Sequence, residues 1–171
     1  APFERQGFSE DDLLDFTPEL RQRALAIARQ YRWGPLYSPP SLQNAPDSTR
    51  GTLSLPASTG GANWEGGALD PETGFLYIPS VTAPSFLSLV PGGRVSDMNY
   101  IAGGGRGQLA PGVSFVKPPW GRITAIDLTT GDHAWMVPNG DTPDFVAERL
   151  KLPPESIPNT GRSSRAGLLV T

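Results

Sequence analysis

The sequence has no cysteine, a single histidine (His133) and only two lysines (Lys117 and Lys151). The absence of cysteine excludes disulfide bonds, thiolate zinc sites and a cysteine nucleophile. Long apolar runs are also missing, because no stretch approaches the length of about 18 residues that a membrane-spanning helix needs. Residues 1–12 lack the apolar core of a signal peptide, so we expect any targeting signal to lie outside this chain.

An excess of charge of one sign is lacking as well. The chain carries 14 Lys and Arg against 17 Asp and Glu, which gives a net charge of -3. Such a balance offers no basic surface, so nucleic acid and anionic membranes are not expected partners. Glycine and proline are abundant, with 20 and 19 residues, among apolar residues spread along the whole chain. This composition predicts a mainly β fold with many turns.

One helical region is expected near the N-terminus, at about 9–33. Thr17-Pro18-Glu19 is a start signal, because Thr caps, Pro suits the first helical position and Glu favours the positive helix end. Gly34-Pro35 predicts the end. A single apolar stripe follows from Leu20, Ala24, Ile27 and Tyr31. Ser9 with Asp12 indicates a shorter capped turn before it.

The remaining pattern alternates between strands and long loops. Strand signals occupy 51–56, a strand-turn-strand unit 66–80 and a hairpin 121–138. Residues 82–118 and 138–167 are expected to be long loops, with a short helix at 143–151 in the second. The final residues 167–171 (GLLVT) are typical of the first half of a strand, and we expect its partner to lie outside this chain.

A weak internal repeat connects two of these units. Residues 68–80 and 125–138 share Ala-x-Asp-x-x-Thr-Gly followed by an aromatic residue. Repetition of a strand, a Thr-Gly turn and a second strand suggests successive propeller blades separated by long inserts. Asp70 and Asp127 precede the two turns, and we interpret both as turn-stabilising acceptors.

The second repeat resembles the tryptophan-docking motif of quinoprotein dehydrogenases, in which Ala-x-Asp-x-x-Thr-Gly-x-x-x-Trp recurs in an eight-bladed propeller. Ala125, Asp127, Thr130, Gly131 and Trp135 match it. Because Ala leaves room for an indole, Trp135 is expected to reach toward the next blade and bury a large area against it.

The segment Gly60-Gly61-Ala62-Asn63-Trp64 resembles a Gly-Gly-x-Asn-Trp segment of the same enzymes, beside their central channel. The resemblance implies that the Asn63 amide donates a hydrogen bond to an oxygen of pyrroloquinoline quinone (PQQ), and that the glycines admit a flat ligand. Asn63 and Trp64 are therefore the candidate cofactor-binding residues. The alternatives are that Asn63 only shapes a turn and that Trp64 only packs between blades.

Three further segments resemble the branch that contains membrane glucose dehydrogenase and quinate dehydrogenase. They are 17–40, 118–128 (PPWGRITAIDL) and 137–143 (VPNGDTP). The resemblance places the chain in the C-terminal half of the propeller. The expected fold is therefore mainly β, a single fragment over 1–171 that holds about two to three propeller blades and one helical insert.

The resemblance implies a part of an oxidoreductase that oxidises a sugar or polyol with PQQ and passes electrons to a quinone or a cytochrome. The family's catalytic Asp, its cofactor-contacting Lys and Arg, and its calcium or magnesium ligands are expected outside this chain, which alone is expected to be inactive. Periplasmic localisation is implied, with membrane contact only through outside parts. Two alternatives remain: a non-enzymatic propeller scaffold, and a cofactor-free fragment that associates with the rest of the propeller or with itself through open sheet edges.

Several polar motifs are given structural interpretations. His133 is expected to be a solvated hairpin residue. Gly103–Gly107 resembles a phosphate loop only superficially, because no helix start follows it, and a mobile surface loop is expected. The acidic cluster of Asp11, Asp12 and Asp15 does not follow the EF-hand pattern and is expected to be a solvated helix start.

Overall fold

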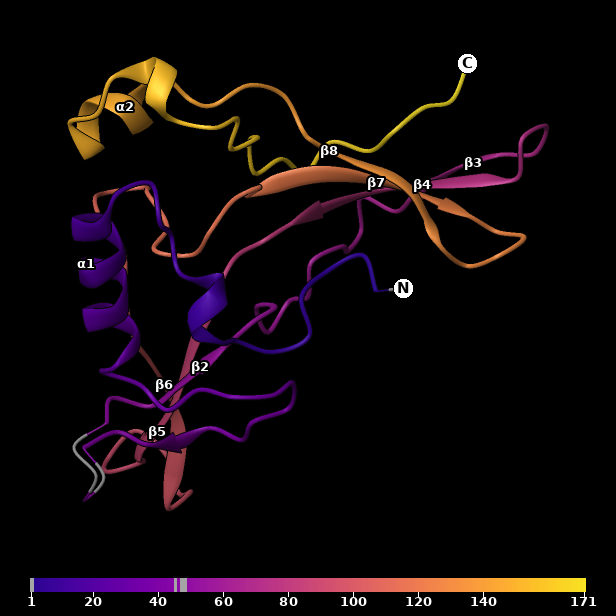
Figure 1. The fold of residues 1–171 in the computed structure, drawn as a ribbon. Coiled ribbons are helices and arrows are strands. Elements are labelled where there is room, and N and C mark those ends of the chain that lie inside the picture. Colours follow the sequence, from indigo (N-terminus) through magenta and orange to yellow (C-terminus); the bar gives the residue numbers. More distant parts are fainter. Residues whose placement is uncertain (1, 45, 47–48) are drawn as a thin grey trace.

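The computed structural model describes residues 2–44, 46 and 49–171. Within these residues it forms two four-stranded sheets and two short α-helices, with no closed barrel, as expected of part of a propeller (Figure 1). The first sheet contains β1 (Ser41–Leu42), β2 (Thr52–Ser54), β5 (Ser85–Pro91) and β6 (Tyr100–Gly104). The second contains β3 (Ala68–Asp70), β4 (Phe75–Val81), β7 (Gly121–Asp127) and β8 (His133–Pro138).

The predicted N-terminal helix begins where expected but ends early. Helix α1 spans Pro18–Ala28, and the Thr17 hydroxyl accepts a hydrogen bond from the Leu20 amide at 3.2 Å. The predicted end at Gly34-Pro35 is wrong, because Arg32 pairs with Thr52 of β2, and its carbonyl accepts from the Leu53 amide at 2.7 Å. The short turn before α1 is the 3₁₀ helix η1 (Glu10–Asp12), and the predicted Ser9–Asp12 capping box is confirmed.

The second sheet is an antiparallel meander in the order β3-β4-β7-β8, and we call it the blade. The predicted strand-turn-strand unit and the hairpin are both confirmed, as β3–β4 and β7–β8. The interpretation of the repeat as two successive blades is wrong, because both copies lie side by side in this one sheet. Seven residue pairs join β4 to β7, from Phe75↔Asp127 to Val81↔Gly121.

A single row of residues across the blade explains the repeated alanines. Ala68 pairs with Tyr77, Tyr77 with Ala125, and Ala125 with Trp135. The Tyr77 and Trp135 rings approach to 5.6 Å between centroids, and Ala125 between them is fully buried. A β-bulge between Ala125 and Ile126 absorbs the extra residue of the second copy. Trp135 remains 42% exposed, and its packing on a further blade stays a prediction.

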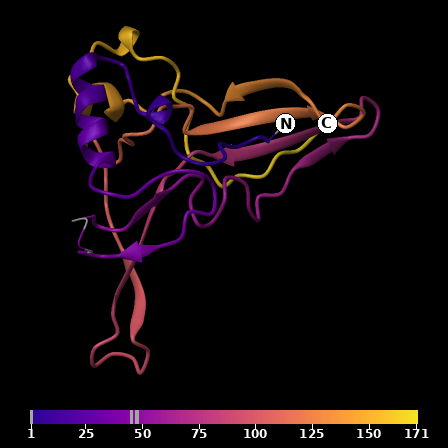
Figure 2. The ribbon, with the colours of Figure 1, turned by 60° about the horizontal axis from the view of Figure 1, so that its bottom comes forward.

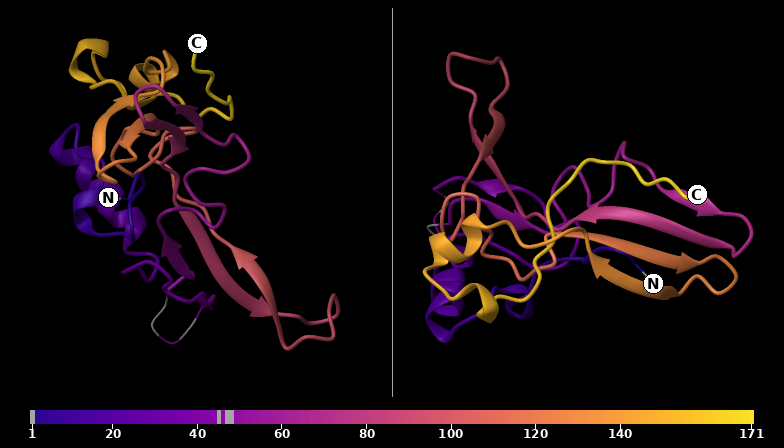
Figure 3. Two further views of the ribbon diagram at one scale, coloured as in Figure 1. Left: turned by 90° about the vertical axis from the view of Figure 1, so that its right-hand side faces the viewer. Right: turned by 90° about the horizontal axis from the view of Figure 1, so that it is seen from above.

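The expected long loop at 82–118 is wrong in its middle, where β5 and β6 form a hairpin. This hairpin projects away from the blade and the helices (Figure 2), and the view from above separates it clearly from the blade (Figure 3). The apolar run Phe86–Val90 was the signal for β5. The loop expected at Gly103–Gly107 is wrong in its first part, because Gly103 and Gly104 end β6. Gly105 follows in close contact with Tyr31, where an added Cβ would lie 2.6 Å from the hydroxyl.

The hydrophobic core lies beside the blade, between α1, the first sheet and the segment that leads into β7. Phe115 is completely buried there, and Trp120 donates its indole N–H to Val116 O at 2.8 Å. Other members of this core are Phe8, Leu13, Leu14, Leu20, Ala24, Leu53, Val113 and Val146.

The C-terminal part holds the expected short helix as α2 (Phe145–Leu150), followed by the 3₁₀ helix η2 (Pro154–Ser156). The expected strand at 167–171 is not formed, and Leu169 is 86% exposed. His133 also departs from the prediction, because it is half-buried and its Nε2 atom is buried with no hydrogen-bond partner in the described structure. No helix in the described residues is long and apolar enough to cross a membrane.

A buried ion pair joins the N-terminal segment to the blade. Arg122 of β7 contacts Glu4, and both residues are more than nine-tenths buried. The Thr82 hydroxyl donates to the Glu4 carboxylate at 3.2 Å, and Arg122 Nε donates to Ser80 Oγ at 3.3 Å. Buried charges of this kind are tolerated only when they are paired and hydrogen-bonded.

Arg5, the next residue, strengthens the same attachment. It donates to Lys117 O at 2.8 Å and pairs with Asp12 at 3.4 Å. Burial lowers the pKa of Arg5, and the charge of Arg122 adds to that effect, while Asp12 and Glu4 oppose it. The N-terminal segment is therefore fixed to both the core and the blade.

Removal of one member of the buried pair should be far more costly than removal of both. We expect Arg122→Ala to lower the free energy of unfolding by about 3–5 kcal/mol, because Glu4 would be buried without a counter-ion. The double variant Glu4→Gln/Arg122→Met should lose much less. Urea denaturation of the three proteins measures the difference, and a double variant as unstable as Arg122→Ala would contradict the assignment.

The two repeated turns each depend on an aspartate, as predicted. The Thr129 hydroxyl donates to the Asp127 carboxylate at 2.6 Å, and the Thr73 hydroxyl to Asp70 at 2.6 Å. These side-chain bonds, followed by those from the Thr129 and Glu72 amides, hold the pKa of Asp127 and of Asp70 below the usual value. A lowered pKa contributes stability above the unfolded-state pKa, and that contribution is lost as the pH falls through the folded-state pKa.

Asp127→Asn should therefore lower the melting temperature slightly at pH 7, with the difference shrinking as the pH falls below about 4. Thermal denaturation monitored by circular dichroism across this range measures the effect. Asp97→Asn, at an exposed position outside both turns, serves as the control. An equal difference from the natural chain at pH 7 and in acid would rule out the carboxylate as the cause.

Candidate functional site

The predicted site residues lie in a loop that leads into β3, an edge strand of the blade. The Gly60 amide donates to Ala57 O at 2.8 Å, and the Gly66 amide donates to Asn63 O at 3.0 Å. Gly60 and Gly66 have φ values of +78° and +66°, which favour glycine. We call residues 60–66 the Asn63 loop.

The backbone of Asn63 closes the turn, while its side chain is left for other uses. The residue is exposed, and its amide has no hydrogen-bond partner among the described residues. Trp64 is 97% exposed. The indole is open to solvent within the described residues, so both its packing between blades and its contact with a cofactor stay predictions.

The Asn63 loop forms one wall of a small hollow of about 210 Å³. The floor is the end of β4, and the Val81 amide there donates to Gly61 O at 2.7 Å. The opposite wall is the C-terminal segment 163–165, whose Arg165 lies 3.9 Å from the Glu65 carboxylate. Segments far apart in the sequence thus meet around Asn63.

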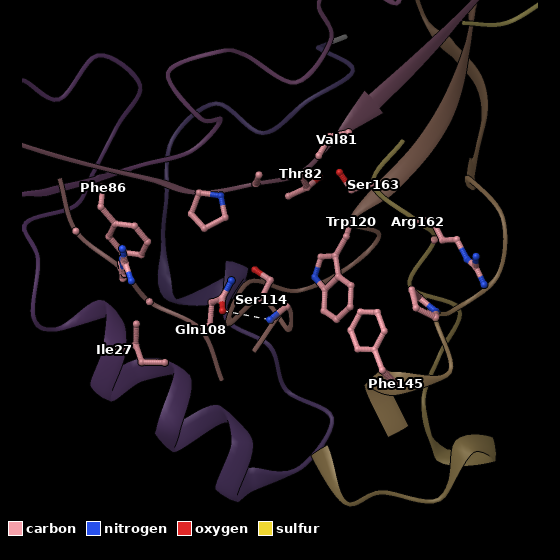
Figure 4. Close-up of a pocket in the computed structure, with 18 of the residues that line it drawn as sticks. Ile27, Val81, Thr82, Phe86, Gln108, Ser114, Trp120, Phe145, Arg162 and Ser163 are labelled. Atoms are coloured by element: carbon pink, nitrogen blue, oxygen red, sulfur yellow. Dashed lines mark hydrogen bonds between the residues drawn. The ribbon is translucent and has the colours of Figure 1, made fainter. Parts of the chain in front are cut away.

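A larger cavity of about 1080 Å³ adjoins this hollow and shares Val81, Ala83 and Ser163 with it. Figure 4 shows Ile27 of α1 and Phe86 on one side of the cavity, with Trp120 and Phe145 on the other. Its polar lining includes Gln30, Arg106, Gln108, Ser114 and Arg162. Aromatic walls with a few polar groups are typical of small-molecule sites.

Neither the cavity nor the buried ion pair was found from the sequence. The cavity depends on 105–112, part of the expected long loop, where Gly107 lies close to Phe86 and Ile27. The ion pair joins Glu4 to Arg122 across most of the chain. A signal for it existed, because Arg122 places a charge near the start of β7, where the next four residues carry none.

No group of three or more His, Asp and Glu residues in the described part of the chain could hold a metal ion. The acidic cluster instead makes ion pairs: Asp12 with Arg5, and Asp15 with Lys117 at 2.8 Å. The prediction that these residues form only a solvated helix start is therefore incomplete, because Asp12 and Asp15 are ion-paired.

The chemistry of the residues around the hollow suits one side of a planar quinone with carboxylate groups. Asn63 offers an amide donor that has no partner in the described structure, and Arg165 offers a largely exposed guanidinium. The exposed Trp64 indole offers a flat apolar face. These residues would hold one side of the cofactor.

Comparison with known proteins agrees with this geometry. The family described as "PQQ: Glucose/ethanol/alcohol dehydrogenase, beta-propeller domain" matches residues 1–171. The "Quinate/shikimate dehydrogenase (quinone)" of Acinetobacter baylyi is 27% identical over 169 residues, which cover 86% of this chain and 20% of that protein. The "Probable quinate dehydrogenase (quinone)" of Xanthomonas campestris pv. juglandis is 29% identical over an aligned length of 186 residues. That alignment covers 94% of this chain and 23% of that protein.

The chain spans about a fifth of the length of these curated relatives. Its blade, its Asn63 loop and the match over all 171 residues lead to one conclusion. The chain belongs to the family of PQQ-linked glucose, ethanol and alcohol dehydrogenases and represents part of their β-propeller domain.

Proposed function

We propose that this chain is part of an enzyme that oxidises a sugar or polyol alcohol with PQQ and passes the electrons to a quinone or a cytochrome. The relatives are named for quinate and shikimate, so cyclic polyols that carry a carboxylate are the first substrates to test. The observation that carries the proposal is the unpartnered Asn63 amide at the edge of the hollow.

When bound, PQQ supplies the hydride acceptor for the alcohol. The residues of this chain would orient it: Asn63 donates a hydrogen bond to a quinone oxygen, and Gly60 and Gly61 allow the ligand to approach the backbone. The adjoining cavity would admit the alcohol from the side lined by Trp120 and Phe145. No side chain of this chain is assigned the role of catalytic base.

The remaining machinery belongs, in this proposal, to the rest of the propeller. That part would supply the calcium or magnesium ligands, the catalytic Asp and any membrane contact, in the periplasm. The exposed apolar residues of the blade support association with neighbouring blades. They are Leu69, Leu128, Trp135, Met136 and Val137.

A non-enzymatic scaffold would need the same apolar contacts between blades. It would have no use for an open amide beside a hollow, so Asn63 favours the enzyme. A measurement of PQQ binding therefore distinguishes the enzyme from the scaffold.

The longer protein that contains this chain should bind PQQ in the presence of calcium and reduce an artificial dye with sugars, polyols or quinate. Asn63→Ala should weaken PQQ binding about tenfold, the cost of one hydrogen bond. Asn99→Ala, at an exposed position in the β5–β6 connection, should leave binding unchanged. Titration by fluorescence quenching measures the dissociation constant, and a longer protein that neither binds PQQ nor oxidises any alcohol would exclude the enzyme.

The 171-residue chain alone should bind PQQ only weakly, because it offers one wall of the site. Isothermal titration calorimetry with PQQ and calcium tests this. A submicromolar dissociation constant would contradict the incomplete site.

A further inference from the structure

Glu4 lies directly beneath the glycine pair that leads into Asn63. A Cβ atom on Gly61 would lie 2.7 Å from Cγ and 2.9 Å from Oε2 of Glu4. The φ of Gly61 is outside the left-handed region, so this position needs glycine for space and not for backbone conformation. The Asn63 loop therefore rests on the Glu4 side chain.

The Glu4 side chain is not free to swing aside. Its carboxylate is paired with Arg122 and accepts the Thr82 hydroxyl at 3.2 and 3.3 Å through its two oxygens. Glu4, Thr82 and Arg122 are 6%, 2% and 5% exposed, respectively. Movement of this carboxylate would leave a buried guanidinium without a counter-charge, which is costly.

Two consecutive residues of β4 and its extension complete the attachment. The Val81 amide holds the Gly61 carbonyl at 2.7 Å, and the adjacent Thr82 holds Glu4. The Asn63 loop is thus held at the Gly61 carbonyl by Val81, and the Cα of Gly61 packs against the Glu4 side chain, which is itself fixed. Ser80, which lines the hollow, accepts from the same Arg122.

We infer that Glu4 is a positioning residue: its carboxylate, fixed by Arg122 and Thr82, sets the height of the Asn63 loop and so the place of the Asn63 amide at the hollow. The consequence for the cofactor rests on the proposed function, whereas the contact between Glu4 and Gly61 does not. Glu4 itself touches neither substrate nor cofactor in this assignment.

Stability measurements on the 171-residue chain test the contact without any cofactor. Gly61→Ala should lower the melting temperature clearly. Gly104→Ala is the matched control, because a Cβ there meets no atom within 4 Å and φ is also outside the left-handed region, and it should have little effect. A Gly61→Ala variant as stable as Gly104→Ala would overturn the inference.

If Glu4 supports the Asn63 loop, substitutions at positions 4 and 61 should change the free energy of unfolding by amounts that do not add. When Gly61→Ala is added to Glu4→Ala/Arg122→Met, most of its cost should disappear, since the two nearest atoms, Cγ and Oε2 of Glu4, are gone and no unpaired charge remains. An equal cost in both backgrounds would overturn the inference. If that background does not fold, amide hydrogen exchange in the natural background decides: exchange at Val81 should rise several-fold in Gly61→Ala and not in Gly104→Ala.

PQQ titration of the longer protein separates the two proposals. If Glu4 acts through Asn63, Glu4→Ala/Arg122→Met and Asn63→Ala should each weaken PQQ binding, and their combination should add little further loss. Glu4→Gln, which retains the shape of the side chain, should keep more affinity than Glu4→Ala. Fully additive losses would overturn positioning through Asn63. Coupling between positions 4 and 61 with no effect of Asn63→Ala on PQQ would instead reject the cofactor role and leave the contact in place.

Discussion

The Arg122–Glu4 pair is the interaction on which the arrangement of this chain depends. It joins the third strand of the blade to the N-terminal segment, and that segment in turn holds the core through Arg5 and Asp12. Its two charges are removed from water, so the pair stabilises the fold only as a complete, hydrogen-bonded unit. The Asn63 loop rests on it, so the amide that we propose as a cofactor contact is held by the same buried charge pair that joins the N-terminal segment to the blade.

The blade divides this structure into two faces with different tasks. Because side chains alternate along β7, Arg122 and Ala125 point to opposite sides of the sheet. The side of Arg122 receives the N-terminal segment. The side of Ala125 carries the Tyr77 and Trp135 rings, which fill the space that the small side chain leaves.

The sequence predicted those features that depend on local rules. The Thr17 cap, the Ser9–Asp12 capping box and the two Asp-to-Thr turns each need only a few neighbouring residues, and all are confirmed. The repeat was recognised, but its assignment to two blades was wrong. The pairing of β4 with β7 joins distant segments, and the residues of neither repeat alone predict it. The end of α1 was misplaced for the same reason, since Arg32 forms backbone hydrogen bonds with the segment of β2, far from α1 in the sequence.

The candidate site was predicted only in part. Asn63 and Trp64 were found from a short motif, and the structure leaves both side chains exposed beside or near a hollow. Their support by Glu4 and the adjoining cavity depend on contacts between residues that lie up to the length of the chain apart. Such contacts follow from packing and not from spacing.

The pairing of Val81 with Gly121 has a consequence for how the length of this chain can vary. Residues 82–120 leave the blade and return to it at directly opposed positions on neighbouring strands. Because closure entropy grows only slowly with the length of a flexible loop, the turn between β5 and β6 can vary in length more easily than the buried part of this excursion, which contains Phe115 and Trp120. The projecting hairpin and one wall of the larger cavity thus belong to a single excursion, which leaves the meander and returns to it at one pair of neighbouring positions.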